Sequence, residues 1–310
     1  MATRSEAMAS SRHPDGIRPE QCVWCGLPLA ESGTRLRGRT RCASCGAATT
    51  DPWPSERELE DAYAHYRPES GRFSGVGDHL LRRTRARLAR RIDRLAPPGA
   101  VLDVGAGDGA LLDALVGHGR RSLGLERDPR RPDMREADIS ELGAEWSAIV
   151  FWHALEHLPA AGEAVDHACG HVRRGGVLVI AIPNTASLQA RAFGDRWFHL
   201  DLPRHLVHLS AETLLERLRS RGLTPIRVSH WRGGQVLFGW LHGMVGSLPG
   251  RPALYDAIRR PDARSAPMTR RRRALALAAG AGLFPVAALA AVVEVVARRG
   301  GTVYVEARRD

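Results

Sequence analysis

The sequence predicts an α/β protein with a doubly wound, mostly parallel seven-stranded sheet, a small N-terminal ribbon and a helical insertion near the C-terminus. Short β-type runs alternate with helical stretches between residues 101 and 231, which is typical of parallel strands joined by helices. A glycine-rich turn follows the first of these runs. Two closely spaced cysteine pairs between residues 22 and 45 predict the ribbon.

The glycine-rich turn lies in residues 101–109, Val-Leu-Asp-Val-Gly-Ala-Gly-Asp-Gly. An apolar strand contains Asp103, and Gly105, Gly107 and Gly109 then lead into a helical stretch. Glycines at a strand-to-helix turn let the backbone pass close under a nucleoside or phosphate at the positive end of the helix. The spacing is G-x-G-x-G and differs from the dinucleotide pattern G-x-G-x-x-G. It therefore indicates a nucleoside site of another kind.

The following strands support this interpretation. Residues 122–126 form a second short strand ending in Glu126, where a carboxylate can accept hydrogen bonds from ribose hydroxyls. Asp138 follows a third apolar stretch. Residues 148–152 and 177–182 read as the fourth and fifth strands, with a helix over about 160–172 between them. Residues 224–230 and 301–308 suit the last two strands, the final one antiparallel.

These motifs resemble those of class I S-adenosylmethionine (SAM)-dependent methyltransferases. The resemblance implies a Rossmann-like fold and SAM as the cofactor, with an acid near the adenine amino group. It assigns cofactor binding to Asp103, Gly105, Gly107, Gly109, Glu126, Asp138 and Trp152.

The cysteine pairs have the spacing of a zinc ribbon. Cys22-x2-Cys25 and Cys42-x2-Cys45 are separated by sixteen residues, and two such turns can place four thiolates around one zinc ion. A closed site of this kind is structural, since it holds a segment too short to bury a core of its own. Cys169 stands alone in a helical stretch and is expected to be a small buried apolar residue.

Composition sets the broad class. The 310 residues carry a formal net charge of +11, but every basic residue other than histidine is arginine and these are dispersed, so the charge alone does not indicate nucleic acid. The polar start lacks a signal peptide, and we expect a cytoplasmic, reducing environment. The expected organisation is a disordered tail (1–18), zinc ribbon (19–50), linker helix (51–76), methyltransferase domain (77–231 and 301–310) and hydrophobic helical insertion (232–300).

His153 is the first candidate for a general base. It follows the fourth strand, at the sheet edge where ligands bind in such folds, and lining the cofactor pocket is the alternative role. Residues 153–157 resemble the Glu-x-x-Glu-His of ubiquinone-biosynthesis O-methyltransferases, where these side chains are linked with a divalent metal. Here His153 replaces the first glutamate, and Glu156 and His157 keep the other positions. The change removes a hard oxygen ligand and weakens the case for magnesium.

A second set of candidates follows the fifth strand. Pro203-Arg204-His205-Leu206-Val207-His208 resembles a Pro-Arg-His-Leu-x-His signature of a bacterial methyltransferase subgroup. His205 and His208 are the alternative bases, in a loop suited to hold the methyl acceptor. The other interpretation is that Arg204 and His208 brace, through Asp201, the helix that Ser210 caps.

The insertion contains two apolar stretches, residues 236–248 and the uncharged run 274–293. The second is long enough to span a bilayer, but Pro285 and its glycines are expected to break it. One reading is a helical cap on the domain. The other is a helical hairpin in one leaflet, anchored by Arg270–Arg273 and Arg298–Arg299, with peripheral contact through 236–248 and 274–297 at the inner face of the membrane.

The leading functional prediction is a SAM-dependent methyltransferase acting on the hydroxyl of a small-molecule or glycan/lipid-linked acceptor, with the ribbon helping to form the acceptor site. A zinc-ribbon rRNA or tRNA methyltransferase is an alternative, in which arginines 35, 37, 39 and 41 contact phosphates. The chain lacks the Asn/Asp-Pro-Pro-aromatic and Pro-Cys motifs of such enzymes, so nucleic acid is not favoured. A non-catalytic SAM-binding or scaffold protein is the third reading.

Overall fold

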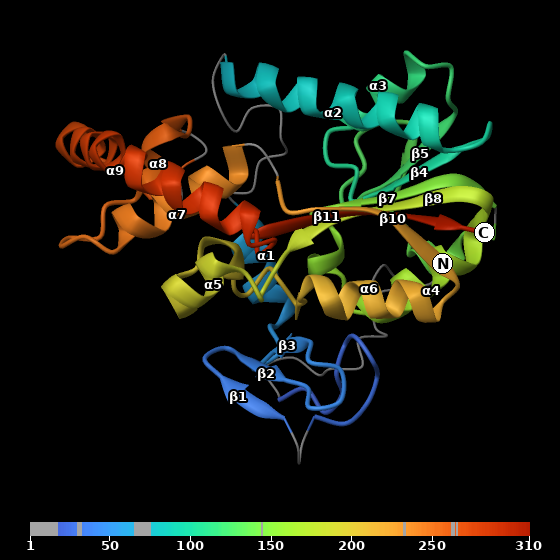
Figure 1. Cartoon of the computed structure of the whole chain (residues 1–310), viewed down its shortest axis with the longest axis horizontal. Coiled ribbons are helices and arrows are strands. Elements are labelled where there is room, and N and C mark those ends of the chain that lie inside the picture. The colour runs from blue at the N-terminus through green and yellow to red at the C-terminus, as the bar shows by residue number, and fades with distance from the viewer. Residues whose placement is uncertain are drawn as a thin grey trace.

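The computed structural model describes residues 18–29, 33–64, 76–143, 145–231, 234–261, 264 and 266–310. Residues 1–17 of the predicted tail lie outside this part. The described chain forms a layered α/β body with the ribbon against one layer and a helical lobe at one end (Figure 1).

A seven-stranded sheet forms the centre of the molecule. Its strands are β4 (Val101–Val104), β5 (Ser122–Leu125), β6 (Met134–Arg135), β7 (Trp146–Trp152), β8 (Val172–Pro183), β10 (Leu223–Ser229) and β11 (Thr302–Arg309). They lie in the order β10-β11-β8-β7-β4-β5-β6. Strands β4 to β8 pair in parallel, whereas β11 is antiparallel to both neighbours. The predicted doubly wound, mostly parallel sheet is confirmed.

Helices cover both faces of the sheet. Helices α2 (Val76–Leu95) and α3 (Ala110–Val116) lie on one face, and α4 (Ala161–His171) and α6 (Ala211–Ser220) on the other (Figure 1). Alternate residues of β7 enter separate cores: Val150 packs with the α2 side and Phe151 with the α4 side, both 0% exposed. Burial on both faces explains why residues 148–152 read as a continuous apolar run.

Strand β8 is longer than predicted. It begins at Val172, immediately after α4, and not at residue 177. The strand runs through the Gly175-Gly176 pair. Gly175 has φ 73°, and the pairing with β7 shifts register between Trp146 and Ala148. Such a bulge at a glycine lets β8 continue across the irregular residues. The apolar pattern that marks the rest of the strand does not extend to this part, so the sequence did not reveal it.

The ribbon is joined to the main body by a shared sheet. Strands β1 (Thr34–Leu36), β2 (Arg39–Arg41) and β3 (Ala48–Thr50) pair in order, and β3 also pairs antiparallel with β9 (Val207–His208). Strand β9 belongs to the loop after β8. Helix α1 (Glu56–Tyr63) follows the ribbon and starts with a capping box between Ser55 and Glu58.

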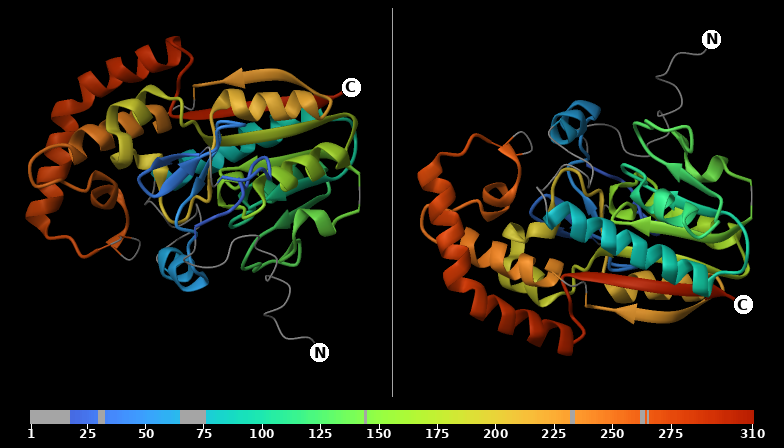
Figure 2. Two further views of the ribbon diagram at one scale, coloured as in Figure 1. Left: turned by 90° about the horizontal axis from the view of Figure 1, so that it is seen from below. Right: turned by 90° about the horizontal axis from the view of Figure 1, so that it is seen from above.

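The insertion is helical, as predicted. It contains α7 (Gly234–Gly246), α8 (Leu254–Ile258) and α9 (Arg270–Val296), and it packs beside α5 (Leu188–Phe193) and the short η3 (Gly194–Arg196) and η4 (Phe198–Leu200). Helix α9 is continuous over 27 residues with Pro285 inside it, so the expected break is wrong. Proline removes one hydrogen bond of the helix. The helix stays continuous because α7 and α8 pack along α9 and stabilise it. The helix lies along the outer edge of the molecule (Figure 2).

Candidate active site

The turn between β4 and α3 is a left-handed glycine loop. Gly105, Gly107 and Gly109 have φ 75°, 61° and 82°. A Cβ atom on Gly105 would lie 2.5 Å from the Cβ of Ala154, whereas one on Gly107 would meet nothing within 4 Å. Glycine at 105 therefore allows the loop to pack on the β7 turn. At Gly107 the space beside the loop stays open to a ligand.

Two acidic residues flank this loop. Asp103 is 3% exposed in β4, directly before the turn. Glu126 follows β5 and turns back towards the glycines: its Oε2 accepts the N–H of Gly107 at 2.6 Å and its Oε1 accepts the N–H of Arg127 at 3.0 Å. The structure thus brings together Asp103, the glycines and Glu126 at one end of the parallel strands.

The other two predicted cofactor residues have structural roles in the described chain. Asp138 caps the short η1 helix (Ile139–Glu141), accepting the N–H of Ser140 at 2.8 Å. Trp152 is buried at the end of β7, and the guanidinium of Arg85 lies 4.3 Å from its ring centroid. Trp152 ends β7 and Asp138 follows β6, and both strands end at the same edge of the sheet as the strand before the glycine loop.

His153 lies at the carboxyl end of β7 in a strained backbone conformation. Its φ is 52°, and its N–H donates to the carbonyl of Ala181 at 2.8 Å. The ring Nδ1 lies 3.3 Å from Oε1 of Glu156, which is 3% exposed on η2 (Leu155–His157). Burial raises the pKa of Glu156. Residues held at positive φ are typical of sites where the position of a side chain matters more than local stability.

Glu156 and His205, which are buried, and the half-buried His157 form a group whose ligand atoms lie within 4.8 Å of one another. The Nδ1 atoms of His157 and His205 each lie 3.0 Å from a backbone carbonyl, of Arg204 and His199 respectively. A carbonyl only accepts, so each Nδ1 carries the hydrogen and each Nε2 the lone pair. Burial lowers the pKa of His157 to about 4 and also lowers that of His205.

The loop after β8 is fastened internally. Arg204 donates three hydrogen bonds to Asp201 at 3.2, 2.7 and 2.6 Å, and Asp201 has φ 41°. Burial opposes the charge on Asp201, but His205 and Arg204 together hold its pKa below the usual value. Ser210 caps α6 by accepting from Thr213 at 3.0 Å. Arg204 therefore holds Asp201 within the loop, whereas His205 belongs to the group with Glu156 and His157.

His208 does not join that group. It lies on β9, and its Nε2 is 3.0 Å from Oγ1 of Thr50, whose hydroxyl donates to the carbonyl of His205 at 2.6 Å. A hydroxyl has one hydrogen, so Nε2–H of His208 donates to Thr50. Burial lowers the pKa of His208 to about 3. A small cavity of about 10 Å³, room for one water molecule, separates His208, His205 and Glu156.

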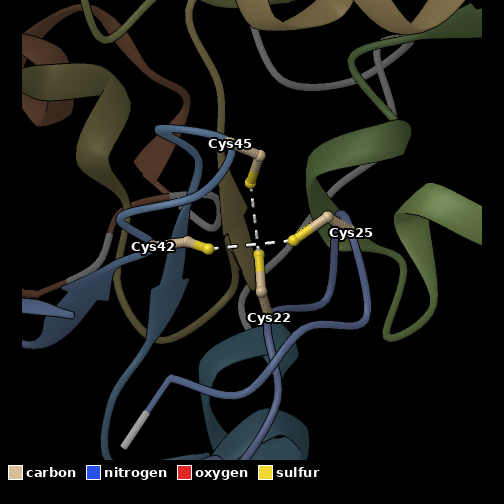
Figure 3. A group of neighbouring side chains, drawn as sticks. All are labelled: Cys22, Cys25, Cys42 and Cys45. Atoms are coloured by element: carbon tan, nitrogen blue, oxygen red, sulfur yellow. Dashed lines mark hydrogen bonds between the residues drawn. The ribbon is translucent and has the colours of Figure 1, made fainter. Parts of the chain in front are cut away.

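The four predicted ribbon cysteines lie together. Their sulfur atoms point to a common centre (Figure 3). The Sγ atoms of Cys22 and Cys45 are 3.7 Å apart, as are those of Cys25 and Cys42. This is far longer than a disulfide of about 2.05 Å and close to the edge, about 3.8 Å, of a tetrahedron with Zn–S of about 2.3 Å.

The ribbon also packs on the main domain away from its cysteines. The guanidinium of Arg217, on α6, lies 4.7 Å from the ring centroid of Trp24 and pairs with Asp166 of α4 at 2.8 Å. The N–H of Gly162 donates to the carbonyl of Val23 at 3.1 Å. The buried residues of the ribbon and of the α4 face form one hydrophobic cluster. The ribbon and the sheet therefore share a core.

Comparison with known proteins decides the identity of the central domain. Residues 78–228 match the family model described as a methyltransferase domain. This protein contains a methyltransferase domain. The strand order, with the last strand antiparallel inside the sheet, agrees with the class I resemblance in the sequence. A search of curated proteins finds no match.

Solved structures similar to this methyltransferase include a SAM-dependent methyltransferase from Archaeoglobus fulgidus (16% identity, TM-score 0.45, 73% of this chain and 94% of that one). Another is magnesium protoporphyrin IX methyltransferase from Synechocystis (15% identity, TM-score 0.41, 56% and 87%). A third is a possible histamine N-methyltransferase from Thermotoga maritima (13% identity, TM-score 0.41, 74% and 92%).

The glycine loop of the methyltransferase fits SAM. The nucleoside and the methionine part of SAM need a close backbone approach and hydrogen-bond acceptors for hydroxyl and ammonium groups. The open space at Gly107 allows the close backbone approach, and the carboxylates of Asp103 and Glu126 supply the hydrogen-bond acceptors. Each carboxylate oxygen of Glu126 has a second acceptor position beyond its backbone contact.

Several contacts of the site were not predicted from the sequence. The hydroxyl of Tyr63 lies 2.9 Å from Nδ1 of His157, which links α1 to the histidine group. Phe198 of η4 packs edge-on against Phe238 and Tyr255, with centroids 5.4 and 5.1 Å away. These contacts link the loop of the methyltransferase to its helical insertion. Single aromatic residues in amphipathic stretches carry no local signal of such partners.

Proposed function

We propose that the methyltransferase transfers a methyl group from SAM to a hydroxyl of a small-molecule or glycan/lipid-linked acceptor, with His153 as the general base. The observation that carries this proposal is the pairing of His153 with the buried carboxylate of Glu156 at the carboxyl end of β7. A hydroxyl acceptor must lose a proton as it is methylated, and an imidazole accepts one near neutral pH.

The pairing orients the imidazole for this role. If Nδ1–H of His153 donates to Glu156, Nε2 carries the lone pair that takes the acceptor proton. The resulting imidazolium is then stabilised by the carboxylate 3.3 Å away. The hydrogen bond that His208 donates to Thr50 gives His208 a structural role in this proposal.

The cofactor is held by residues of the glycine loop and its neighbours. In this proposal, Glu126 accepts hydrogen bonds from the ribose hydroxyls and Asp103 supports the loop, while Asp138 lies towards the adenine. SAM supplies an activated methyl group on a sulfonium. The residues around it supply position and exclude water, which is the main contribution a protein makes to an in-line displacement.

We also propose that the ribbon holds one structural zinc ion through Cys22, Cys25, Cys42 and Cys45. The support is the sulfur spacing and the matched turns, in which Gly26 and Gly46 donate to the carbonyls of Cys22 and Cys42 at 2.8 and 3.0 Å. Since β3 pairs with β9, a closed zinc site would fix the loop that carries His205. The ribbon would thereby help to form the acceptor site.

Transfer of labelled methyl from SAM to fractionated cell extract tests the proposal. We expect label in the lipid or small-molecule fraction. Label confined to RNA would replace the proposal with the nucleic-acid alternative. Binding of SAM without transfer to any fraction would favour the non-catalytic reading.

The role of His153 is tested separately with the acceptor fraction so identified. His153→Ala should lower kcat by roughly a hundredfold or more with little change in SAM affinity. His118→Ala is the control, because His118 is an exposed histidine just beyond the end of α3 that is far from the glycine loop. Equal activity of the two variants would overturn the assignment of His153.

A further inference from the structure

Helix α9 exposes apolar side chains along its whole length. Leu275, Phe284, Val286, Leu289 and Val293 are between 50% and 66% exposed, and Val296 is 77% exposed. Residues 274–293 contain no charged side chain and no side-chain hydrogen-bonding group. A helix on the surface of a water-soluble protein normally turns polar residues outward. The outward face of α9 lacks them, and contiguous apolar surface of this kind marks an interaction site.

The opposite face of α9 is fixed to the insertion. Its buried residues form a narrow stripe of small side chains, Ala276, Gly280, Ala287 and Ala291, ending in Glu294. Glu294 is 0% exposed and accepts hydrogen bonds from Nε2 of Gln189 at 2.7 Å and Nε1 of Trp240 at 2.8 Å. The helix is thus held along one side, and its C-terminal end leads directly into β11. It is placed to lie along a surface and not to cross a bilayer.

The charges at the ends of α9 indicate what that surface is. Arg270, Arg271, Arg272 and Arg273 form the first turn, which contains no acidic residue. Cations there oppose the helix dipole and do not stabilise it, and within the described residues only Arg273 of the four donates a side-chain hydrogen bond, from Nε to the carbonyl of Ala257 at 2.9 Å. Together with the dipole they create a site for an external anion. Arg298 and Arg299 add exposed positive charge at the other end.

We propose that α9 lies in the plane of an anionic membrane leaflet, with its apolar face among the acyl chains and Arg270–Arg273 on lipid phosphates. An apolar face bounded by arginines complements such a surface in both hydrophobicity and charge. Helix α7 packs beneath α9 and contributes Val236 and Val245 to the buried interior, so the contact is made by α9 and not by residues 236–248.

The membrane contact also indicates which kind of methyl acceptor the site takes. This inference rests on the proposed function. Phe198 contacts His242 of α7 at 4.8 Å between ring centroids, and the adjacent His199 accepts the hydrogen bond from His205 through its carbonyl. The insertion therefore touches the loop beside the catalytic group. We infer that the acceptor is a hydroxyl of an amphiphile held in the same leaflet.

Co-sedimentation of the full chain with lipid vesicles tests the membrane contact. The vesicles are pure phosphatidylcholine, or phosphatidylcholine with 30% phosphatidylglycerol, at low and high salt. We expect binding to the anionic vesicles that weakens with salt. Leu289→Glu/Val293→Glu should weaken it at least tenfold, because both side chains face outward. Arg270→Gln/Arg271→Gln/Arg272→Gln should abolish the preference for anionic vesicles.

The matched controls use residues on the main domain. Val116→Glu replaces a valine that is 65% exposed on α3, and Arg82→Gln/Arg83→Gln/Arg87→Gln removes exposed charges from α2. Both should bind vesicles like the unchanged protein. Failure of the unchanged protein to bind either vesicle would overturn the proposal. Self-association that Leu289→Glu/Val293→Glu abolishes, without vesicle binding, would assign the face to a second copy of the chain.

Methylation assays distinguish failure of the membrane proposal from failure of the proposed methyltransferase function. Leu289→Glu/Val293→Glu should keep its SAM affinity and lose methylation only of acceptors embedded in vesicles. If vesicle binding is lost while methylation of the vesicle-embedded acceptor is unchanged, the inference about the acceptor is overturned. If the unchanged protein binds vesicles but methylates nothing, the proposed function fails and the membrane contact stands.

Discussion

Replacing Thr50 by valine tests whether the ribbon and the loop carrying His205 act as one unit. Thr50 is 3% exposed; its hydroxyl donates to the carbonyl of His205 at 2.6 Å and accepts from His208 at 3.0 Å. Valine has nearly the same shape, so the change removes two hydrogen bonds and leaves two buried polar groups without that partner. At about 1–3 kcal/mol for each such group, the free energy of unfolding should fall by about 2–6 kcal/mol.

The assay is urea unfolding followed by tryptophan fluorescence, since Trp24 and Trp53 lie in the core shared by the ribbon and the sheet. Thr34→Val is the control, because Thr34 is exposed on the outer ribbon strand and its replacement should change stability by less than about 0.5 kcal/mol. We also expect Thr50→Val to lower kcat while SAM affinity stays within twofold. A stability equal to that of Thr34→Val would refute the coupling between ribbon and loop.

Four further outcomes are expected. Metal analysis of protein purified without chelator should find one zinc per chain, and Cys42→Ser should lose it together with methyl transfer; a second equivalent of metal would place an ion elsewhere in the chain. Glu126→Ala should weaken SAM binding by about 2–3 kcal/mol, measured by calorimetry, since a carboxylate hydrogen-bonded to two hydroxyls is lost.

The third outcome concerns pH and the fourth the catalytic pair. Burial lowers the pKa of His208 to about 3, below its unfolded value near 6.5, so the unfolded state binds more protons between these values. Stability should therefore fall as pH drops from 7 to 5, and less steeply in His208→Asn, as urea midpoints would reveal. Glu156→Gln should lower kcat at least tenfold and shift the pH profile of kcat, whereas loss of activity with an unchanged profile would indicate a role in folding alone.

The sequence predicted the parts of the site that depend on local patterns. The glycine loop and the two cysteine pairs are recognisable because their residue types and spacings dictate backbone shape or ligand geometry. The strands were found because burial on both faces produces continuous apolar runs. The family match of residues 78–228 bears out this interpretation.

What the sequence did not predict depends on contacts between distant segments. The pairing of Ala48 with His208 joins residues far apart in the chain, and two short strands of ordinary composition give no sign of it. The same holds for Tyr63 and His157. Pro285 was read by its local preference as a break, but packing on α7 and α8 keeps α9 continuous. Tertiary context outweighed propensity at that position.

The place of β11 in the sheet has a consequence for biosynthesis. This strand lies between β10 and β8, and β10 is bonded to the sheet through β11. During translation β11 leaves the ribosome after the whole insertion, so the sheet stays open at this edge until α9 has been made. An apolar helix and an unfilled sheet edge are then exposed at the same time. A nascent chain in this state would be a client for chaperones, and early contact of α9 with lipid would shorten the exposure.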